Sequence, residues 1–232
     1  MTWHDGACHF LSVEDQYRLP FNTPRHIPYR AYTRKNLGYL YAIALGAETL
    51  FDTDDDNDMN AAIKVIDPDD PHYETVFNPE MTKDTVINPY KHFGRSDIWP
   101  RGYPLEQIDA KKNYSMASTL IMPPELEGRA LVLQGLADLD PDVDAIFRLT
   151  NPEDIATVHF DKKASPIKLA RGIASPFNSQ NTLWHKDAFW GMLLPITVTF
   201  RATDIMRGYW CQRMLWDIGA VLAFGPPTVD QV

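Results

Sequence analysis

The most regular hydrophobic pattern of the chain covers residues 35–45. Its apolar side chains recur with the i, i+3, i+4, i+7 spacing of one helical face: Leu37, Leu40, Tyr41 and Ala44. Gly46 follows directly, at the position where a glycine commonly ends a helix. Residues 49–51 are a short apolar run that stops at five acidic side chains within residues 52–58. This pattern predicts a helix, then a buried strand that ends in an acidic loop.

Patterns in the rest of the chain predict further strands alternating with helices. Short strands are expected at residues 6–12, 145–149, 197–200 and 221–224. Helices are expected at residues 13–19 after the N-cap Ser12, at 186–194, and at 204–218 before Gly219. Residues 68–104 and 175–182 are rich in turn-forming side chains, and Pro226 and Pro227 should close the last strand. The alternation predicts a single α/β domain over residues 1–232, a sandwich with a mostly parallel central sheet.

Charge and cysteine content exclude several classes of function. The formal net charge of -9, without a cluster of Lys and Arg, argues against nucleic acid as a partner. Cys8 and Cys211 form neither a disulfide framework nor a paired metal motif. The longest apolar stretch, residues 188–200, is interrupted by Gly191 and Pro195 and is too short to cross a bilayer. We therefore expect no signal segment and no membrane span in this chain, and a cytoplasmic location is the simplest expectation.

The acidic run is the strongest candidate for chemistry. Carboxylates crowded into one loop repel each other unless water screens them or a cation lies among them, and oxygen ligands favour Mg²⁺, Mn²⁺ or Ca²⁺ over Zn²⁺. An EF-hand calcium loop is excluded, because Asn57 stands at its sixth position and Ile63 at its twelfth. A solvated surface turn is the alternative. A strand that ends in Asp-x-Asp is also the pattern with which GT-A glycosyltransferases hold a cation against the diphosphate of a sugar nucleotide.

Several blocks of the sequence, in the same order, resemble the STELLO proteins and their relatives. These blocks are TRKNLGYLYAI at 33–43, FDTDD at 51–55, NPYKHFG at 88–94, WPRG at 99–102, PDVD at 141–144, NSQNT at 178–182, AFWG at 188–191, DIMRGYW at 204–210 and PPT at 226–228. That family has a glycosyltransferase-like domain that is distantly similar to the plant UDP-arabinopyranose mutases. The resemblance implies a GT-A-like α/β/α sandwich in which the first strand of the nucleotide-binding half is absent or very short.

The resemblance also implies roles for individual residues. The metal ligands would be Asp54 and Asp56, with Asp52 and Asp230 as further oxygen donors to Mn²⁺ or Mg²⁺. The residues that bind the nucleotide sugar would be Arg34, Lys35, Asp54, Asp55, His92, Trp99, Arg101, Asn178, Asn181, His185 and Arg207, and Trp184 is a second candidate to stack on a sugar ring. Asp204 would be the general base, although an Asp at a helix N-terminus is also favoured by the helix dipole alone.

Three functions follow from these residues. The first is a metal-dependent glycosyltransferase that moves a hexose, or a pentose such as xylose, from a UDP-sugar to a glycan or other hydroxyl acceptor with inversion. The second is a sugar-nucleotide mutase, and the third is a scaffold for glycan synthesis without catalysis. The resemblance adds a second location, a luminal domain excised from a Golgi-anchored parent. The sequence leaves the sugar, the acceptor and the oligomeric state open.

Overall fold

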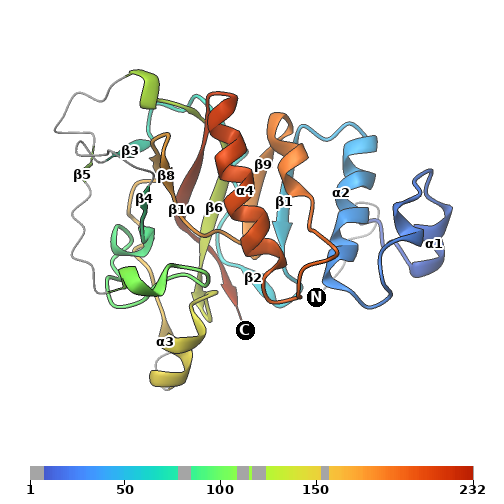
Figure 1. Cartoon of the computed structure of the whole chain (residues 1–232), viewed down its shortest axis with the longest axis horizontal. Helices are drawn as coiled ribbons and strands as arrows, with labels where there is room; N and C mark the ends of the chain where they lie inside the picture. Colours follow the sequence, from blue (N-terminus) through green and yellow to red (C-terminus); the bar gives the residue numbers. More distant parts are fainter. Residues whose placement is uncertain (1–7, 78–84, 109–114, 117–123, 153–156, 232) are drawn as a thin grey trace.

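A mixed β-sheet forms the centre of the structure, a computed structural model that describes residues 8–77, 85–108, 115–116, 124–152 and 157–231 (Figure 1). Its strands follow the order β1 (Thr49–Thr53), β9 (Asn181–His185), β6 (Arg129–Leu139), β10 (Ala220–Gln231), β7 (Ile167–Leu169), β3 (Glu74–Phe77) and β5 (Ser115–Met116), and β2 (Asn57–Met59) pairs with β10. A separate pair consists of β4 (Thr85–Val86) and β8 (Ile173–Ala174).

Four α-helices lie in the described part of the chain: α1 (Val13–Arg18), α2 (Lys35–Ala44), α3 (Ala145–Thr150) and α4 (Thr203–Asp217). Short 3-10 segments are η1 (Thr23–Arg25), η2 (Tyr32–Arg34), η3 (Pro89–Lys91), η4 (Leu105–Gln107), η6 (Pro124–Leu126) and η8 (Lys186–Met192). Helix α4 crosses the central strands, where it contacts β10, and α2 lies beside β1 with α1 beyond it (Figure 1). No helix among the described residues is long and apolar enough to cross a membrane.

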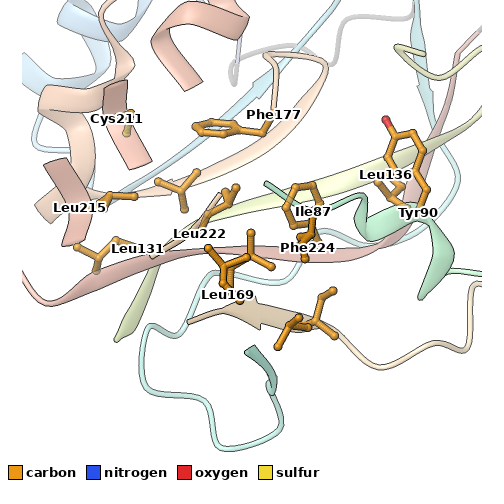
Figure 2. Close-up of a cluster of buried hydrophobic side chains, with 14 of the residues drawn as sticks. Ile87, Tyr90, Leu131, Leu136, Leu169, Phe177, Cys211, Leu215, Leu222 and Phe224 are labelled. Carbon is orange, nitrogen blue, oxygen red and sulfur yellow. The ribbon is translucent and has the colours of Figure 1, made fainter. Parts of the chain in front are cut away.

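The hydrophobic core lies between the central strands and the elements that cover them. Leu131 and Leu222 from the two central strands, with Leu215 and Cys211 from α4, are labelled in this core (Figure 2). All four side chains are at most 2% exposed. Burial raises the pKa of the Cys211 thiol to about 12, so this cysteine is an inert core residue.

Local sequence signals explain the elements that were predicted correctly. Ser12 caps α1 through a capping box with Asp15. Helix α2 is followed by Gly46 and α4 by Gly219, and both glycines have positive φ values, 83° and 71°. The apolar run at 49–51 lies within β1. The α/β class and the mixed sheet, consistent with a GT-A-like fold, are therefore confirmed.

The balance of strand directions differs from the expected, mostly parallel sheet. Parallel pairs in the described main sheet are β6 with β10 and β3 with β7, while the other five pairs are antiparallel. The central parallel pair has α4 in the connection before β10, as a parallel crossover requires. By contrast, β9 is antiparallel to both of its neighbours, β1 and β6.

Several predicted elements were wrong, and in each the local capping or exposure explains the difference. Residues 145–149 form the helix α3, because Asp144 accepts a hydrogen bond from the Ile146 backbone N–H as its N-cap. Residues 197–200 form turns, where Phe200 is 62% exposed. The described part of the strand expected at 6–12, residues 8–12, contains no strand, and Phe10 is 81% exposed.

Two further elements of the C-terminal half differ in detail from their prediction. The helix expected at residues 186–194 is the 3-10 helix η8, which ends at Met192. Strand β10 continues through Pro226 and Pro227, which were expected to end it. The pairing of β10 with β6 shifts register between Gly225 and Val229, and such a bulge accommodates prolines that cannot donate to the ladder.

Candidate functional site

The acidic run begins inside β1 and continues into the turn before β2. Asp52 belongs to β1 and is 3% exposed, whereas Asp55 and Asp56 in the turn are exposed. Strand β2 pairs with the end of β10, where Asp230 lies opposite Asp58. The acidic turn, residues 54–56, therefore lies beside the end of β10, and Asp52 is buried behind this turn.

Asp52 is the centre of a buried polar network. Its Oδ1 lies 2.8 Å from Lys35 Nζ, and its Oδ2 accepts a hydrogen bond of 2.7 Å from the Tyr39 hydroxyl. Arg207 Nη1 lies 3.7 Å from the same Oδ2. Burial, and then the Asp52 charge, raise the pKa of Tyr39 well above its ordinary value, so the phenol stays a donor. Both oxygens of Asp52 are thus engaged by side chains of the protein.

Lys35 connects the buried acid to the acidic turn. Its Nζ lies 2.8 Å from Asp54 Oδ1, as well as from Asp52, and donates to the Ser179 carbonyl at 3.3 Å. The ammonium also lies 5.2 Å from the centre of the Tyr32 ring. Burial alone would lower the pKa of Lys35, but the two carboxylates outweigh it and hold that pKa above its ordinary value. Lys35 is therefore a permanent cation at the acidic turn.

Arg207 supplies a second, fully buried cation. Its Nη2 donates to the Asn178 carbonyl at 3.1 Å and to Ser179 Oγ at 2.9 Å. The guanidinium lies 4.9 Å from the centre of the Trp184 ring. Burial would lower the pKa of Arg207, but Tyr39 and Asp52 hold it above its ordinary value. The side chain is 0% exposed, so it acts from behind the acidic turn.

A second ion cluster contains Asp204, the predicted base. Arg101 Nη2 lies 2.8 Å from Asp204 Oδ2 and 2.7 Å from Asp142 Oδ2, and Arg101 Nε donates to Asp142 Oδ1 at 2.7 Å. The Asp204 Oδ1 accepts from the Ile205 backbone N–H. Burial would lower the pKa of Arg101, but its bonds to Asp142, and then Asp204, raise it. Asp204 lies in the first turn of α4 and is 4% exposed, with its orientation fixed by Arg101.

The loop before β9 joins the two clusters. The Asn178 carbonyl accepts a hydrogen bond from Arg207 in the first cluster, and Asn178 Nδ2 donates to Asp142 Oδ2 in the second at 2.9 Å. Burial raises the pKa of the nearby Tyr32, Lys35 opposes that effect, and the charges of Asp54 and Asp204 add to it. The acidic turn and the predicted base therefore belong to one continuous polar region.

A pocket opens beside the second cluster. Polar groups of Arg101, Asp142, Asn178 and Gln134 line it together with the rings of Tyr90 and Phe177. The sequence prediction missed Asp142 and Gln134. Asp142 lies in one of the family-like blocks, whereas Gln134 lies in β6, a strand that was not predicted.

Three residues predicted to bind the nucleotide sugar make contacts with residues outside the two clusters. His185 pairs with Thr49 at the start of β1, four residues from its acidic end, or about 13 Å at the usual rise per strand residue. His92 contacts the Ser165 carbonyl through Nε2 at 2.8 Å. Arg34 donates from Nε to Gln16 Oε1 at 2.8 Å.

Three others have structural surroundings. Trp184 is 0% exposed in the core, so its ring cannot stack on a sugar. Trp99 is partly buried and packs edge-on against Phe147, with ring centres 5.9 Å apart. Asn181 is buried and donates to the Leu136 carbonyl at 2.7 Å. These contacts account for Asn181, whereas the indole N–H groups of Trp99 and Trp184 are buried without a hydrogen-bond partner among the described residues.

The carboxylates of the acidic turn have the right chemistry for Mg²⁺ or Mn²⁺, which prefer oxygen ligands. Asp54, Asp56 and Asp230 keep partly or fully exposed side chains, and Gln231 Nε2 donates to Asp56 Oδ2 at 2.9 Å. Within the described ranges, no three His, Cys, Asp or Glu side chains converge on one point as a ready metal site. A cation at Asp54 would share that carboxylate with Lys35, so the donor set fits only if the ammonium shifts.

Comparison with known proteins finds relatives over nearly the whole chain. The chain is 37% identical to the probable glycosyltransferase STELLO2 of Arabidopsis thaliana over 239 aligned residues, and 36% identical to STELLO1 of the same plant. Each alignment covers 99% of this chain, but only 31% and 30% of those proteins. No family model matches the chain. The chain thus spans about a third of the length of the curated relatives it matches.

Proposed function

We propose, from the premise that this chain is homologous to the STELLO-type glycosyltransferase-like family, that it transfers a sugar from a UDP-sugar to a hydroxyl group of a glycan. The observation that carries the proposal is the polar region formed by the acidic turn, Lys35 and the Arg101–Asp204 pair. This region joins cations suited to a diphosphate with a carboxylate suited to accept a proton.

The diphosphate of the donor would lie at the acidic turn. Lys35 is partly exposed, so its ammonium can donate to a phosphate oxygen while Arg207 adds positive charge from behind. Asp54 and Asp56, with Asp230 nearby, would hold Mn²⁺ or Mg²⁺. A bound cation of this kind stabilises the negative charge that forms on a leaving diphosphate.

Asp204 would activate the acceptor. In a single displacement, the acceptor oxygen gives its proton to Asp204 and forms a bond to the anomeric carbon of the sugar. The bond from that carbon to the phosphate oxygen breaks at the same time, and UDP leaves with the electron pair. Arg101 Nη2 lies 2.8 Å from Asp204 Oδ2 and fixes the orientation of this carboxylate. The outcome would be inversion of the anomeric centre.

The pocket beside Asp204 is small, with a free volume of about 10 Å³, so a sugar or acceptor could approach only its mouth unless the lining side chains move. Asn178 and Gln134 in its wall already bond to protein groups, and the rings of Tyr90 and Phe177 are at most 5% exposed. The backbone N–H of Asn178 donates to Gln134 Oε1 at 3.0 Å, so a ligand would compete with hydrogen bonds inside the protein.

One observation favours a second function, a scaffold for glycan synthesis without catalysis. Lys35 already neutralises Asp54, and in the part of the chain that the structure describes no three potential ligands converge on a metal position. Such a protein would keep the fold and the ion pairs but would bind no donor.

A panel of donors separates these functions. We expect the protein with Mn²⁺ to release UDP from at least one of UDP-glucose, UDP-galactose, UDP-xylose and UDP-arabinopyranose, by slow hydrolysis or by transfer to added oligosaccharides. Chromatography would measure both UDP and the remaining sugar nucleotide. An isomerised sugar nucleotide without UDP release would instead indicate a mutase. Neither product, together with no thermal shift by any donor, would contradict the proposal and favour the scaffold.

A further inference from the structure

We propose that Lys35 links cation binding to donor binding. Its ammonium holds Asp54 while the donor is absent and moves to the diphosphate when the donor arrives, so that Asp54 becomes free to bind a cation only then. This inference rests on the proposed function, because it requires that a nucleotide diphosphate binds at the acidic turn. It assigns Lys35 a positioning role that a simple phosphate contact would not require.

The first step of the argument is that Lys35 already has all of its hydrogen-bond partners. An ammonium group has three N–H donors. Lys35 Nζ has three acceptors within reach: Asp52 Oδ1 at 2.8 Å, Asp54 Oδ1 at 2.8 Å and the Ser179 carbonyl at 3.3 Å. The ammonium thus lies between the two carboxylates, where an added cation would repel it. A divalent cation and the Lys35–Asp54 ion pair therefore compete for one carboxylate.

The second step is the charge balance of the network. Asp52 and Asp54 carry two negative charges, and Lys35 and Arg207 carry two positive ones. Asp56 and Asp230, the other proposed ligands, bond to the neutral Gln231 and Asn60, so their two charges would balance a divalent cation. A cation that also uses Asp54 takes this carboxylate from Lys35, and the diphosphate of a nucleotide gives the ammonium a replacement anion, so cation and donor should bind together.

The third step is that Lys35 is the cation of the network that can move. Its side chain is 22% exposed, on a flexible four-carbon stem, whereas Arg207 is fully buried and bonded to Ser179. If Lys35 leaves, Asp52 keeps the Tyr39 hydroxyl and the Arg207 guanidinium. The buried acid therefore does not lose its last partner when the ammonium turns to a phosphate.

The test measures Mn²⁺ binding to the whole chain by electron paramagnetic resonance of free Mn²⁺, with and without UDP. Wild-type protein is expected to bind Mn²⁺ weakly alone and more tightly with UDP. The variant Lys35→Met should bind Mn²⁺ without UDP about tenfold more tightly than wild type, because the competing charge next to Asp54 is gone. The further gain that UDP gives to Mn²⁺ affinity should be smaller in Lys35→Met than in wild type.

Two other variants make the result specific. Lys35→Arg keeps the charge and should restore weak Mn²⁺ binding without UDP. Lys186→Met removes a lysine that pairs with Glu48 at the opposite end of β1 and should behave as wild type. Circular dichroism of each variant would establish that it is folded.

The outcomes separate this inference from the proposed function. If wild type binds UDP but Lys35→Met binds Mn²⁺ no more tightly than wild type, Lys35 does not compete for Asp54 and the inference is overturned. If wild type binds no UDP with or without Mn²⁺, the proposed donor is wrong and the link to donor binding falls with it. The measurement without UDP would still report whether Lys35 and Mn²⁺ compete.

Discussion

Replacing Asp52 by alanine is expected to lower the free energy of unfolding by about 3–5 kcal/mol, the usual cost of leaving a buried charge without its partner. Asp52 is the carboxylate that faces Arg207, whose side chain is 0% exposed. Asp52 also accepts a hydrogen bond from the Tyr39 hydroxyl. Its removal leaves a fully buried guanidinium without its counter-charge and a buried phenol without its acceptor. Urea denaturation followed by circular dichroism measures the change.

Two comparisons test the cause of this loss. The double variant Asp52→Asn with Arg207→Met removes both charges and should be more stable than the sum of the single changes predicts, because the two groups are coupled. Asp69→Ala breaks an exposed pair with Arg129 and should cost less than about 1 kcal/mol. An Asp52→Ala protein as stable as Asp69→Ala would show that the network contributes little.

Replacing Asp204 by asparagine is expected to lower the rate of sugar transfer about 10²–10⁴-fold, the usual contribution of a general base. The amide has the same shape, but it cannot accept the proton of the acceptor hydroxyl. UDP affinity should change little, because Asp204 belongs to the cluster around Arg101 and not to the acidic turn. Initial rates of transfer, with UDP binding measured by calorimetry, separate the two quantities.

A matched control lies on the same helix. Asp217 pairs with Arg213 at the C-terminal end of α4 and is exposed, so Asp217→Asn should leave the rate of transfer unchanged. If Asp204→Asn transfers sugar at the wild-type rate, the carboxylate is not the base. Its bond to Arg101 would then have only a structural role.

The sequence predicted the elements whose signals are local. Helix α2 has a regular apolar face and ends before Gly46, and β1 is followed at once by acids, so both could be placed without tertiary information. Residues 145–149 have the composition of a strand, but the N-cap Asp144 makes them helical. The long central strand β6 was missed. The direction in which each strand runs depends on its neighbours, which a pattern of single residues does not specify.

The candidate site was only partly predictable for the same reason. Asp52, Lys35 and Asp54 lie close together along the chain, and the contact between Lys35 and the acidic turn follows from the packing of α2 beside β1. The contact of Arg207 with Asp52 joins residues far apart in the sequence. The resemblance of whole sequence blocks to a family placed Arg207 among the predicted binding residues. Only the structure indicates that Arg207 is buried behind Asp52.

The most direct test of the proposed site is UDP binding to a variant that carries both Asp54→Asn and Asp56→Asn. Both side chains lie in the turn after β1, and neither is buried, so the fold should remain intact by circular dichroism. We predict that calorimetry finds Mn²⁺-dependent binding of UDP by the wild type and none by the variant. Equal Mn²⁺-dependent binding by the two proteins would contradict the assignment of the acidic turn as the donor site.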